Sequence, residues 1–252
     1  MTQCSELVAY CNNLLDVAAF QDYSPNGLQV EGRPQVNRVI TGVTASQALI
    51  EAAAAAGADM LLVHHGYFWK GEAAPITGFK QRRIHALLEH GINLVAYHLP
   101  LDAHTRVGNN VQLAQHLGWR VTGGLEPNNA RSIGLQGELP EEISGEQLAQ
   151  QLNLGLGREP LYISGHDRPI KRIGWCTGAA QSHIEKAVAL GLDAFITGEV
   201  SEPTYHIARE CGISFFAAGH HATERYGVQA LGENLAEHFG IEHQFIDIDN
   251  PV

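Results

Sequence analysis

A stretch in the first half of the chain recurs in the second half at a constant spacing of 134 residues. The identical pairs at this spacing are Arg38 and Arg172, Gln47 and Gln181, Ile50 and Ile184, Glu51 and Glu185, Ala53 and Ala187, Gly57 and Gly191, and Asp59 and Asp193. A further run, His85 to Ile92, matches His206 to Ile213 at a spacing of 121 residues. A single long repeat that occurs twice predicts two similar lobes. A solenoid would instead stack three or more shorter repeats. The alternative to duplication is that two unrelated helix–strand units came to match because both are rich in glycine and alanine.

Each copy of the repeat has the pattern of a strand, a helix and a second strand. In the first copy, residues 38–43 and 59–63 are mostly apolar segments typical of buried strands, and the helical segment 46–56 between them ends at Gly57. Such a unit pairs its strands in parallel through a right-handed crossover. The sequence therefore predicts an α/β fold with two similar lobes related by internal duplication, which face each other across a pseudo-twofold axis with a cleft between them.

We place the first lobe at residues 1–126 and the second at residues 127–252. The boundary falls at the start of segment 126–146, where Pro127, Asn128, Asn129 and Pro140 are typical of a connection. The C-terminal helix and strand are open to an alternative assignment, in which they pack on the first lobe.

Composition narrows the class of protein. The chain has 252 residues, of which 44% are hydrophobic and 17% charged, as expected for a globular protein with a substantial core. The net charge of −11 argues against non-specific binding to nucleic acid, and residues 80–83 form the only short basic cluster. The four cysteines form no closely spaced pair, and the sequence shows neither an export signal nor a membrane span. We therefore expect a cytoplasmic protein.

Histidines follow predicted strands in both lobes. His64 and His65 come directly after the apolar run 60–63, and His220 and His221 come shortly after the run 215–218. In a chain with 14 histidines a neighbouring pair is weak evidence by itself, so the position of the pairs carries the argument. The carboxyl ends of strands form the edge at which open α/β sheets bind ligands.

Both lobes also place a carboxylate four residues after a histidine, because Asp102 follows His98 and Glu224 follows His220. Residues four apart share one face of a helical turn. Together with the first histidine pair, these side chains are too many for one ion. We therefore predict a dinuclear metal site in the cleft, with Glu224 as the bridging ligand and with the ligand set His64, His65, Asp102, His220 and Glu224. Mixed imidazole and carboxylate donors suit two divalent ions of Zn, Fe, Mn, Ni or Co.

Other polar residues near these segments have two interpretations each. For any single histidine, a hydrogen bond to a backbone carbonyl is the alternative to function, and we interpret His98, His104 and His221 as orienting partners or proton carriers. The loop with Asp22, Asn26, Gln29 and Glu31 is either a substrate contact or a tight turn. Glu199 matches His65 in the repeat and either lies at the cleft or caps the next helix. The aromatic run 67–69 is more typical of packing than of stacking on a substrate.

Several ordered motifs resemble those of the GTP cyclohydrolase 1 type 2 family, the YbgI-like proteins of bacteria. They comprise residues 22–32, 42–47, 63–71, 98–104, 197–202 and 219–224. The resemblance runs nearly end to end and is weakest over residues 127–169. It implies two α/β lobes, a dinuclear divalent-metal site between them and assembly into a toroidal homohexamer. The family's ligands fall on the same five residues that the repeat selects.

The predicted site and the resemblance favour a metal-dependent hydrolase that acts on a purine nucleotide or a related cyclic C–N bond through metal-activated water, with His98 as the proton shuttle. The sequence has no Gly-rich phosphate loop, so a triphosphate would be held by the metals, by Lys70, Arg82 or Arg83, or by a neighbouring subunit. Two alternatives stay open. One is a metal phosphoesterase, and the other is a metal-containing hexameric ring that acts as a scaffold or regulator, including in DNA repair through nucleic acid or repair proteins.

Overall fold

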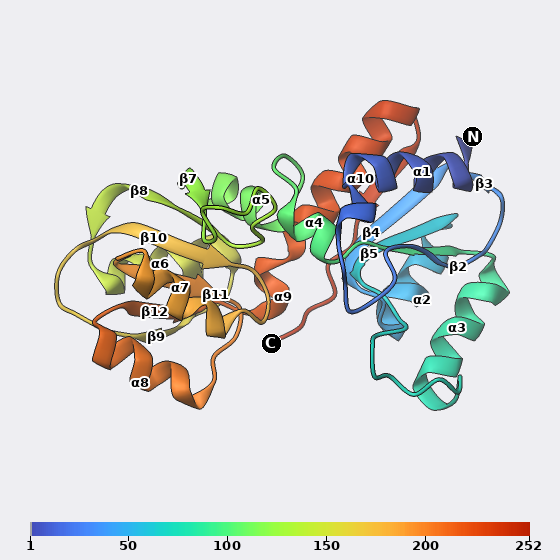
Figure 1. Ribbon diagram of the computed structural model, residues 1–252. Helices are drawn as coiled ribbons and strands as arrows, with labels where there is room; N and C mark the ends of the chain where they lie inside the picture. Colours follow the sequence, from blue (N-terminus) through green and yellow to red (C-terminus); the bar gives the residue numbers. More distant parts are fainter. Residues whose placement is uncertain (1) are drawn as a thin grey trace. The chain divides into compact units, whose positions relative to one another are not determined.

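The computed structural model describes residues 2–252, which divide into two compact units (Figure 1). The first unit comprises the chain up to Leu101 together with Gly227–Asp249, and the second comprises Asp102–Tyr226 together with Asn250–Val252. Each unit contains a mixed sheet with parallel central strands and helices on both faces, so the predicted α/β class is confirmed. Within the described residues, none of the helices combines the length and the apolar character that a membrane crossing requires.

The sheet of the first unit has the strand order β13-β4-β5-β6-β2. Its strands are β2 (Gly27–Val30), β4 (Arg38–Thr44), β5 (Met60–His65), β6 (Asn93–Ala96) and β13 (Glu242–Phe245), and all are parallel except β2. A short antiparallel ladder joins β1 (Thr2–Gln3) to β3 (Gln35–Val36). The helices are α1 (Cys4–Leu14), α2 (Gln47–Ala55), α3 (Gly78–His90), α4 (Leu99–Ala103) and α10 (Arg225–Phe239), of which α4 and α10 each extend into the second unit.

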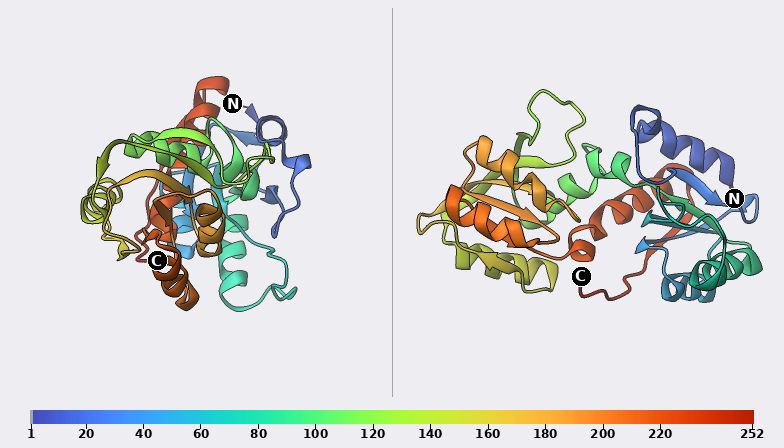
Figure 2. Two further views of the ribbon diagram at one scale, coloured as in Figure 1. Left: turned by 60° about the vertical axis from the view of Figure 1, so that its left-hand side comes forward. Right: turned by 60° about the horizontal axis from the view of Figure 1, so that its bottom comes forward.

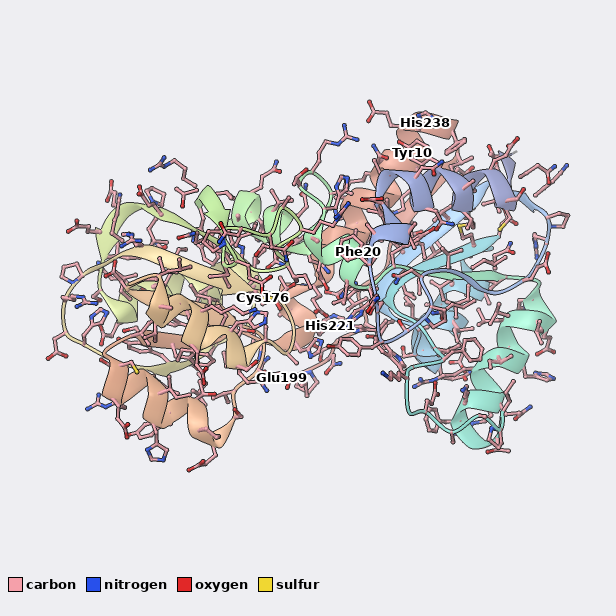
Figure 3. The ribbon with its side chains drawn as sticks, viewed as in Figure 1. Tyr10, Phe20, Cys176, Glu199, His221 and His238 are labelled. Carbon is pink, nitrogen blue, oxygen red and sulfur yellow. The ribbon has the colours of Figure 1, made fainter. Side chains whose placement is uncertain are left out.

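Two pairs of helices cover the two faces of this sheet (Figures 1 and 2). On one face, α2 and α3 bury Leu49 and Leu87 against the strands, and Ser46 caps α2 by accepting a hydrogen bond from the Leu49 amide at 3.2 Å. On the other face, Tyr10 of α1 stacks on His238 of α10 with ring centroids 4.3 Å apart (Figure 3). The apolar faces of all four helices thus enclose the sheet.

The sheet of the second unit has the strand order β7-β8-β10-β11-β12-β9. Its strands are β7 (Arg120–Gly124), β8 (Leu135–Ile143), β9 (Leu161–Ile163), β10 (Ile170–Cys176), β11 (Ala194–Thr197) and β12 (Ser214–Ala217), and only β10, β11 and β12 pair in parallel. The helices are α5 (Asn109–Leu117), α6 (Gly145–Leu156), α7 (Ile184–Ala189), α8 (Glu202–Cys211) and α9 (His220–Thr223). One core lies under α5 and α6, and the other lies under α7 and α8.

The strand pairing repeats in the register that the sequence predicted. Val39 pairs with Met60 in the first sheet, and Ile173 and Ala194, each 134 residues further along the chain, pair in the second. In the first sheet, the third parallel strand is β6, and the antiparallel strand β2 pairs with it. In the second sheet, β12 and the antiparallel strand β9 take the same positions. This repeated register supports the predicted internal duplication.

The boundary between the units differs from the predicted one, since residues 102–126 belong to the second unit and not to the first. Trp119 packs into the core under α5 and α6, and β7 pairs with β8 in the second sheet. Conversely, β13 pairs with β4 in the first sheet, and most of α10 lies in the first unit. Helix α5 and strand β7, which follow β6, therefore belong to the second unit. Most of helix α10 and strand β13, which follow β12, belong to the first.

Candidate metal centre

Three imidazoles lie together at the carboxyl ends of β5 and β6 in the first unit. His64 and His65 end β5, and His98 follows β6 one residue after Tyr97. One ring nitrogen of each imidazole lies within 4.8 Å of those of the other two. His64 is fully buried, and the other two rings are half-buried. Three imidazoles gathered in this way could hold a metal ion.

Each of the three rings engages its Nδ1 atom with an oxygen of the same unit. The pairs are His64 with the Tyr97 carbonyl at 2.9 Å, His65 with Thr44 Oγ1 at 3.2 Å, and His98 with Asp22 Oδ1 at 2.7 Å. Carbonyl and carboxylate oxygens only accept hydrogen bonds, so the proton of His64 and of His98 resides on Nδ1. Nε2 is then the nitrogen that each of these rings offers to a metal.

The loop before β2 fixes His98 through Asp22. Asp22 accepts hydrogen bonds from Asn26 Nδ2 and from the Leu99 amide, both at 2.9 Å, and Asn26 Oδ1 accepts from the His98 amide at 2.7 Å. Burial raises the pKa of the Asp22 carboxyl, but hydrogen bonds from His98 and Asn26 outweigh burial and lower this pKa to about 2. The loop therefore supports an imidazole at the strand end.

Gln29 of β2, the strand that follows this loop, shapes the turn after His65. Its Oε1 atom accepts a hydrogen bond from the Tyr67 amide at 2.7 Å, and a Cβ atom at Gly66 would lie 2.1 Å from it. Only glycine fits this close approach. Tyr67 is buried and donates to the Ala45 carbonyl, so the aromatic run begins with a packing residue, as expected.

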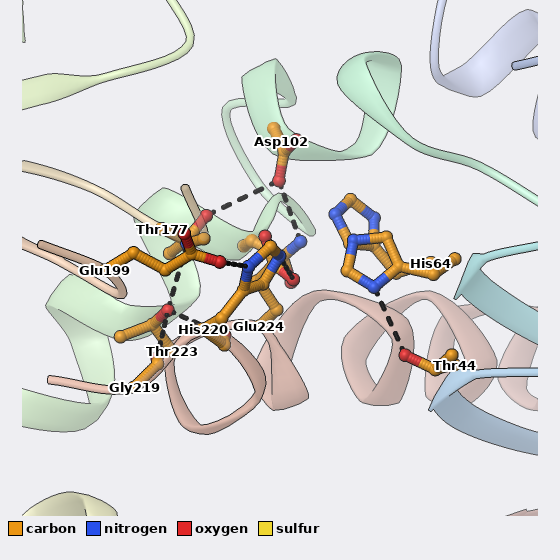
Figure 4. Close-up of polar contacts among 12 residues, drawn as sticks. Thr44, His64, Asp102, Thr177, Glu199, Gly219, His220, Thr223 and Glu224 are labelled. Carbon is orange, nitrogen blue, oxygen red and sulfur yellow. Dashed lines mark hydrogen bonds and ion pairs between the residues drawn. The ribbon is translucent and has the colours of Figure 1, made fainter. Parts of the chain in front are cut away.

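In the second unit, His220 lies between two carboxylates (Figure 4). Its Nδ1 atom is 2.7 Å from Glu199 Oε1, and its Nε2 atom is 3.2 Å from Glu224 Oε2. Burial lowers the pKa of His220, but the hydrogen bonds and charges of Glu224 and Glu199 outweigh burial and raise it to about 9. Glu224 itself is 3% exposed, so a cation at this place would offset the desolvation of its carboxylate.

Asp102 lies in the second unit and is held by two elements of that unit. Its Oδ1 atom accepts a hydrogen bond from Asn109 Nδ2 at 2.8 Å, and Thr177 Oγ1 lies 3.5 Å away (Figure 4). Asn110 Oδ1 in turn accepts from the Thr177 amide at 3.0 Å. The start of α5 and the residue after β10 therefore fix the carboxylate, and no sequence motif singled out Asn109 or Thr177.

The Glu224 carboxylate is packed against a glycine. A Cβ atom at Gly178 would lie 2.1 Å from Glu224 Oε1, and the glycine has a φ of +69° that other residues rarely adopt. Cys176, two residues earlier at the end of β10, is fully buried (Figure 3). Burial raises the pKa of its thiol, and the charges of Asp102 and Glu224 raise it further. The thiol therefore stays protonated beside the carboxylates.

Comparison with known proteins places this fold and these residues in a family. The model of the Duf34/NIF3 (NGG1p interacting factor 3) family matches residues 2–251. The chain belongs to the DUF34/NIF3 family. A protein of Pseudomonas aeruginosa described as a GTP cyclohydrolase 1 type 2 homolog is 61% identical over 248 residues, which are 98% of both sequences. This relative confirms the resemblance seen in the sequence motifs.

Two solved structures share the DUF34/NIF3 fold along their whole length. A structure described as protein ybgI, of unknown function, is 50% identical, with a TM-score of 0.95 and complete coverage of both chains. A crystal structure of a protein from Thermus thermophilus is 36% identical, with a TM-score of 0.90 and the same coverage. The two-unit α/β architecture is therefore that of the family.

In this DUF34/NIF3 protein the predicted ligands occur in two groups, each described within its own unit. The first unit gathers His64 and His65 with His98, the histidine interpreted from the sequence as an orienting partner or proton carrier beside the ligands. The second unit gathers His220 with Glu224. Asp102 belongs to this same unit.

The remaining candidates of the second unit have structural contacts. Glu199 contacts His220, whereas Ser201 is the N-cap residue of α8, so the capping alternative for Glu199 does not hold. His221 is buried, and its amide donates to the Val252 carbonyl at 3.0 Å. His104 Nδ1 accepts hydrogen bonds from the backbone amides of Arg106 and Val107.

Proposed function

We propose that this DUF34/NIF3 protein is a dinuclear-metal-dependent hydrolase that opens a cyclic C–N bond in a purine nucleotide or a related compound. One observation carries the proposal: the three histidines of the proposed ligand set, His64, His65 and His220, each engage Nδ1 with an oxygen of their own unit. Histidines that bind metals commonly have this second hydrogen bond, which fixes the ring and its tautomer. The names of the relatives, GTP cyclohydrolase 1 type 2 homologs, support the choice of reaction.

The residues present fit two divalent ions. We assign the ligands as His64, His65, Asp102, His220 and Glu224, with Glu224 as the bridge. Imidazoles and carboxylates without cysteine suit Zn, Fe, Mn, Ni or Co in a catalytic site. Two such ions, when bound, would lower the pKa of a water to about 7 and neutralise charge that develops in the reaction. On the family resemblance, we also propose a homohexamer that works in the cytoplasm.

His98 supplies the proton transfer in this proposal. In a purine, one water adds across the C8–N7 bond, which places its hydroxyl on C8 and a proton on N7. The hydroxyl then loses its proton as the C8–N9 bond breaks and N9 gains one, and a second water releases C8 as formate. His98 accepts the hydroxyl proton at Nε2 and donates it to N9. Asp22 stays ionised because its pKa is about 2, and its charge stabilises the imidazolium at Nδ1.

Metal analysis combined with product analysis tests the proposal. Purified protein should contain close to two divalent ions per chain and should release formate from purine nucleotides. Glu224→Ala should lose both metal and formate release. Glu202→Ala is the matched control, because the Glu202 side chain is 81% exposed on α8 and lies outside the ligand set. Formate release from metal-stripped protein would contradict the proposal.

The same product analysis distinguishes the hydrolase from the two alternative functions. Phosphate release without formate would identify a phosphoesterase. If neither product forms, salt-dependent binding of the metal-loaded protein to DNA would favour a scaffold or regulator.

A further inference from the structure

A long loop in the first unit begins directly after His65 and joins β5 to α3 (Figure 1). It comprises residues 66–77, whereas residues 198–201 make the corresponding connection between β11 and α8 in the second unit. The longer loop contains the aromatic run 67–69, and the basic cluster 80–83 follows it in α3. The proposed reaction uses neither the aromatic run nor Lys80. Their contacts with one another and with the imidazoles indicate a common role.

Trp69 of this loop packs against two of the three imidazoles. Its ring centroid lies 4.9 Å from that of His98, with the ring planes at 84°, and 5.9 Å from that of His65. The indole Nε1 atom donates to the Gly66 carbonyl at 3.1 Å, which fixes the ring. Because protein interiors are close-packed, a ring in this position limits the rotation of its neighbours. Trp69 therefore restrains the orientation of His65 and His98.

Glu72 holds the backbone at Trp69. Its Oε2 atom accepts a hydrogen bond from the Trp69 amide at 3.1 Å, and its own amide donates to the Trp69 carbonyl at 2.9 Å. The Lys70 amide donates to the Tyr23 carbonyl at 2.6 Å, within the segment that supports His98. The loop is thus fastened on both sides of the indole.

Lys80 in the first turn of α3 holds Glu72 in turn. The Lys80 side chain is 8% exposed, and its Nζ atom lies 3.2 Å from Glu72 Oε1. The same ammonium lies 3.5 Å from the Ala73 carbonyl oxygen and 4.8 Å from the centroid of the Phe68 ring. Phe68 has a φ of +66°, a left-handed backbone that bulky residues rarely adopt. Because a buried ammonium needs such partners, Lys80 fixes the loop around itself.

We propose that Lys80 and Glu72 are positioning residues of the metal centre and that they act through Trp69 on His65 and His98. This inference rests on the proposed function, of which it uses the metal centre and not the reaction. Within the described residues the Lys80 ammonium contacts the loop and none of the imidazoles, so its influence passes through the loop. Loss of this contact frees the indole, and the imidazoles then lose the packing that orients them toward an ion.

A double-mutant cycle on zinc affinity tests the inference. Titration against a zinc-chelating indicator should show about tenfold weaker binding in Trp69→Ala and in Lys80→Met, the lower end of the loss seen when partners of metal-binding imidazoles are removed. The double variant should bind zinc within about twofold of Trp69→Ala, because Lys80 has no effect once the indole is absent. Additive losses in the double variant, or wild-type affinity in Trp69→Ala, would overturn the inference.

Glu72→Ala and Glu242→Ala are a matched pair, because each removes a carboxylate that is paired with a cation in the first unit. Glu242 pairs with Arg38 at the amino ends of β13 and β4, the end of the sheet opposite the imidazoles. Glu72→Ala should weaken zinc binding about tenfold, and Glu242→Ala less than about twofold. Trp69→Phe keeps an aromatic ring and should recover most of the affinity that Trp69→Ala loses. Equal losses in the two glutamate variants would overturn the inference.

Tryptophan fluorescence of the metal-free protein gives a second readout. Trp119 and Trp175 are buried, so quenching by acrylamide reports mainly on Trp69. The quenching constant should rise about twofold or more in Lys80→Met, because local opening exposes the indole, and it should stay at the wild-type value in Glu242→Ala. An unchanged constant in Lys80→Met would contradict a role in holding Trp69.

A combined variant keeps the test decisive if Lys80→Met fails to fold because the Glu72 carboxylate has lost its cation. Lys80→Met with Glu72→Ala removes both charges and takes the place of Lys80→Met in the cycle and in the quenching measurement. It should show the same tenfold loss of affinity, about equal to that of Trp69→Ala.

The inference and the hydrolase proposal fail in different ways. If the zinc affinities are non-additive as expected but no formate is released from purine nucleotides, the hydrolase proposal fails and the role of Lys80 stands. If formate is released and Trp69→Ala binds zinc like the wild type, the inference fails alone.

Discussion

Glu199 Oε1 lies 2.7 Å from His220 Nδ1, and the two residues come from the ends of neighbouring strands of one sheet. Asp22 and His98 form the same pair in the first unit, also at 2.7 Å. Each unit therefore holds one strand-end imidazole by a carboxylate at Nδ1. A carboxylate in this position orients a metal-binding ring and raises its basicity.

Removal of the Glu199 carboxylate should weaken metal binding. In Glu199→Ala, His220 loses the partner of Nδ1, so the affinity for a divalent ion should fall about 10–100-fold in equilibrium titration. Glu199→Gln retains an oxygen acceptor and should lose less. The exposed carboxylate variant Glu202→Ala should bind metal like the wild type. Equal affinities of Glu199→Ala and Glu202→Ala would show that Glu199 does not position the ring.

A methyl group at Gly178 should displace the Glu224 carboxylate. Gly178→Ala places a Cβ 2.1 Å from Glu224 Oε1, so metal content should drop, and the left-handed backbone adds a cost of about 1–2 kcal/mol in unfolding free energy. Gly191→Ala is the control, because Gly191 has a similar φ of +64° and open space around its Cβ position. It should lose stability but keep its metal. Equal metal content in both variants would contradict a close approach at Glu224.

Neutralisation of Asp22 should impair turnover more than metal binding. Asp22→Asn removes the charge that stabilises protonated His98, so kcat for formate release should fall about 10²-fold or more while metal content stays near the wild-type value. Glu31→Gln, an exposed change in the same segment, should leave both unchanged. If kcat and metal content of Asp22→Asn fall in parallel, His98 acts as a metal ligand and not as a proton carrier.

Acid should destabilise the first unit through His243. Its Nε2 atom lies 2.8 Å from Thr41 Oγ1, and burial lowers the pKa of the ring despite the opposing charge of Glu233. The unfolded chain takes up a proton near pH 6.5 and the folded protein only at lower pH, so the unfolding free energy should fall as the pH drops below about 6.5.

Denaturant titrations at several pH values measure this effect. His243→Gln should reduce the dependence of unfolding free energy on pH between about 6.5 and 5. His85→Gln, a change at a side chain that is 64% exposed, should retain the wild-type slope. Parallel slopes for wild type and His243→Gln would rule out this origin of acid sensitivity.

The sequence predicted the parts of the fold that local periodicity determines. The strand–helix–strand units and their 134-residue register are visible in the chain, and so is the placement of His64, His65 and His220 at or just after strand ends. The sheet that takes up β7 was not predictable, because the pattern of a short, mostly polar strand does not say which sheet edge it joins. For β13 the sequence left both lobes open, and the strand pairs in the first sheet. The division after residue 101 follows from that pairing.

The partners of the site side chains were also hidden from sequence reasoning. Asp22 lies 76 residues before His98, and Thr177 lies 75 residues after Asp102. The loop with Asp22 and Asn26 stood out in the sequence, but aspartate, asparagine and threonine near a turn are common for local reasons, so nothing paired Asp22 with His98 or Thr177 with Asp102. Glu199 was the exception, because the repeat aligned it with His65 and thus with a strand end.

The exchange of α10 and β13 sets an order for folding during synthesis. Residues 102–226 of the second unit are contiguous, so they can fold as soon as they leave the ribosome. The N-terminal unit must wait for its edge strand, since Thr41 and its partner His243 are 202 residues apart. Domains usually complete folding from the N-terminus onward. Here the first unit to be synthesised is the last to close, and until then the β4 edge is exposed to chaperones and to neighbouring nascent chains.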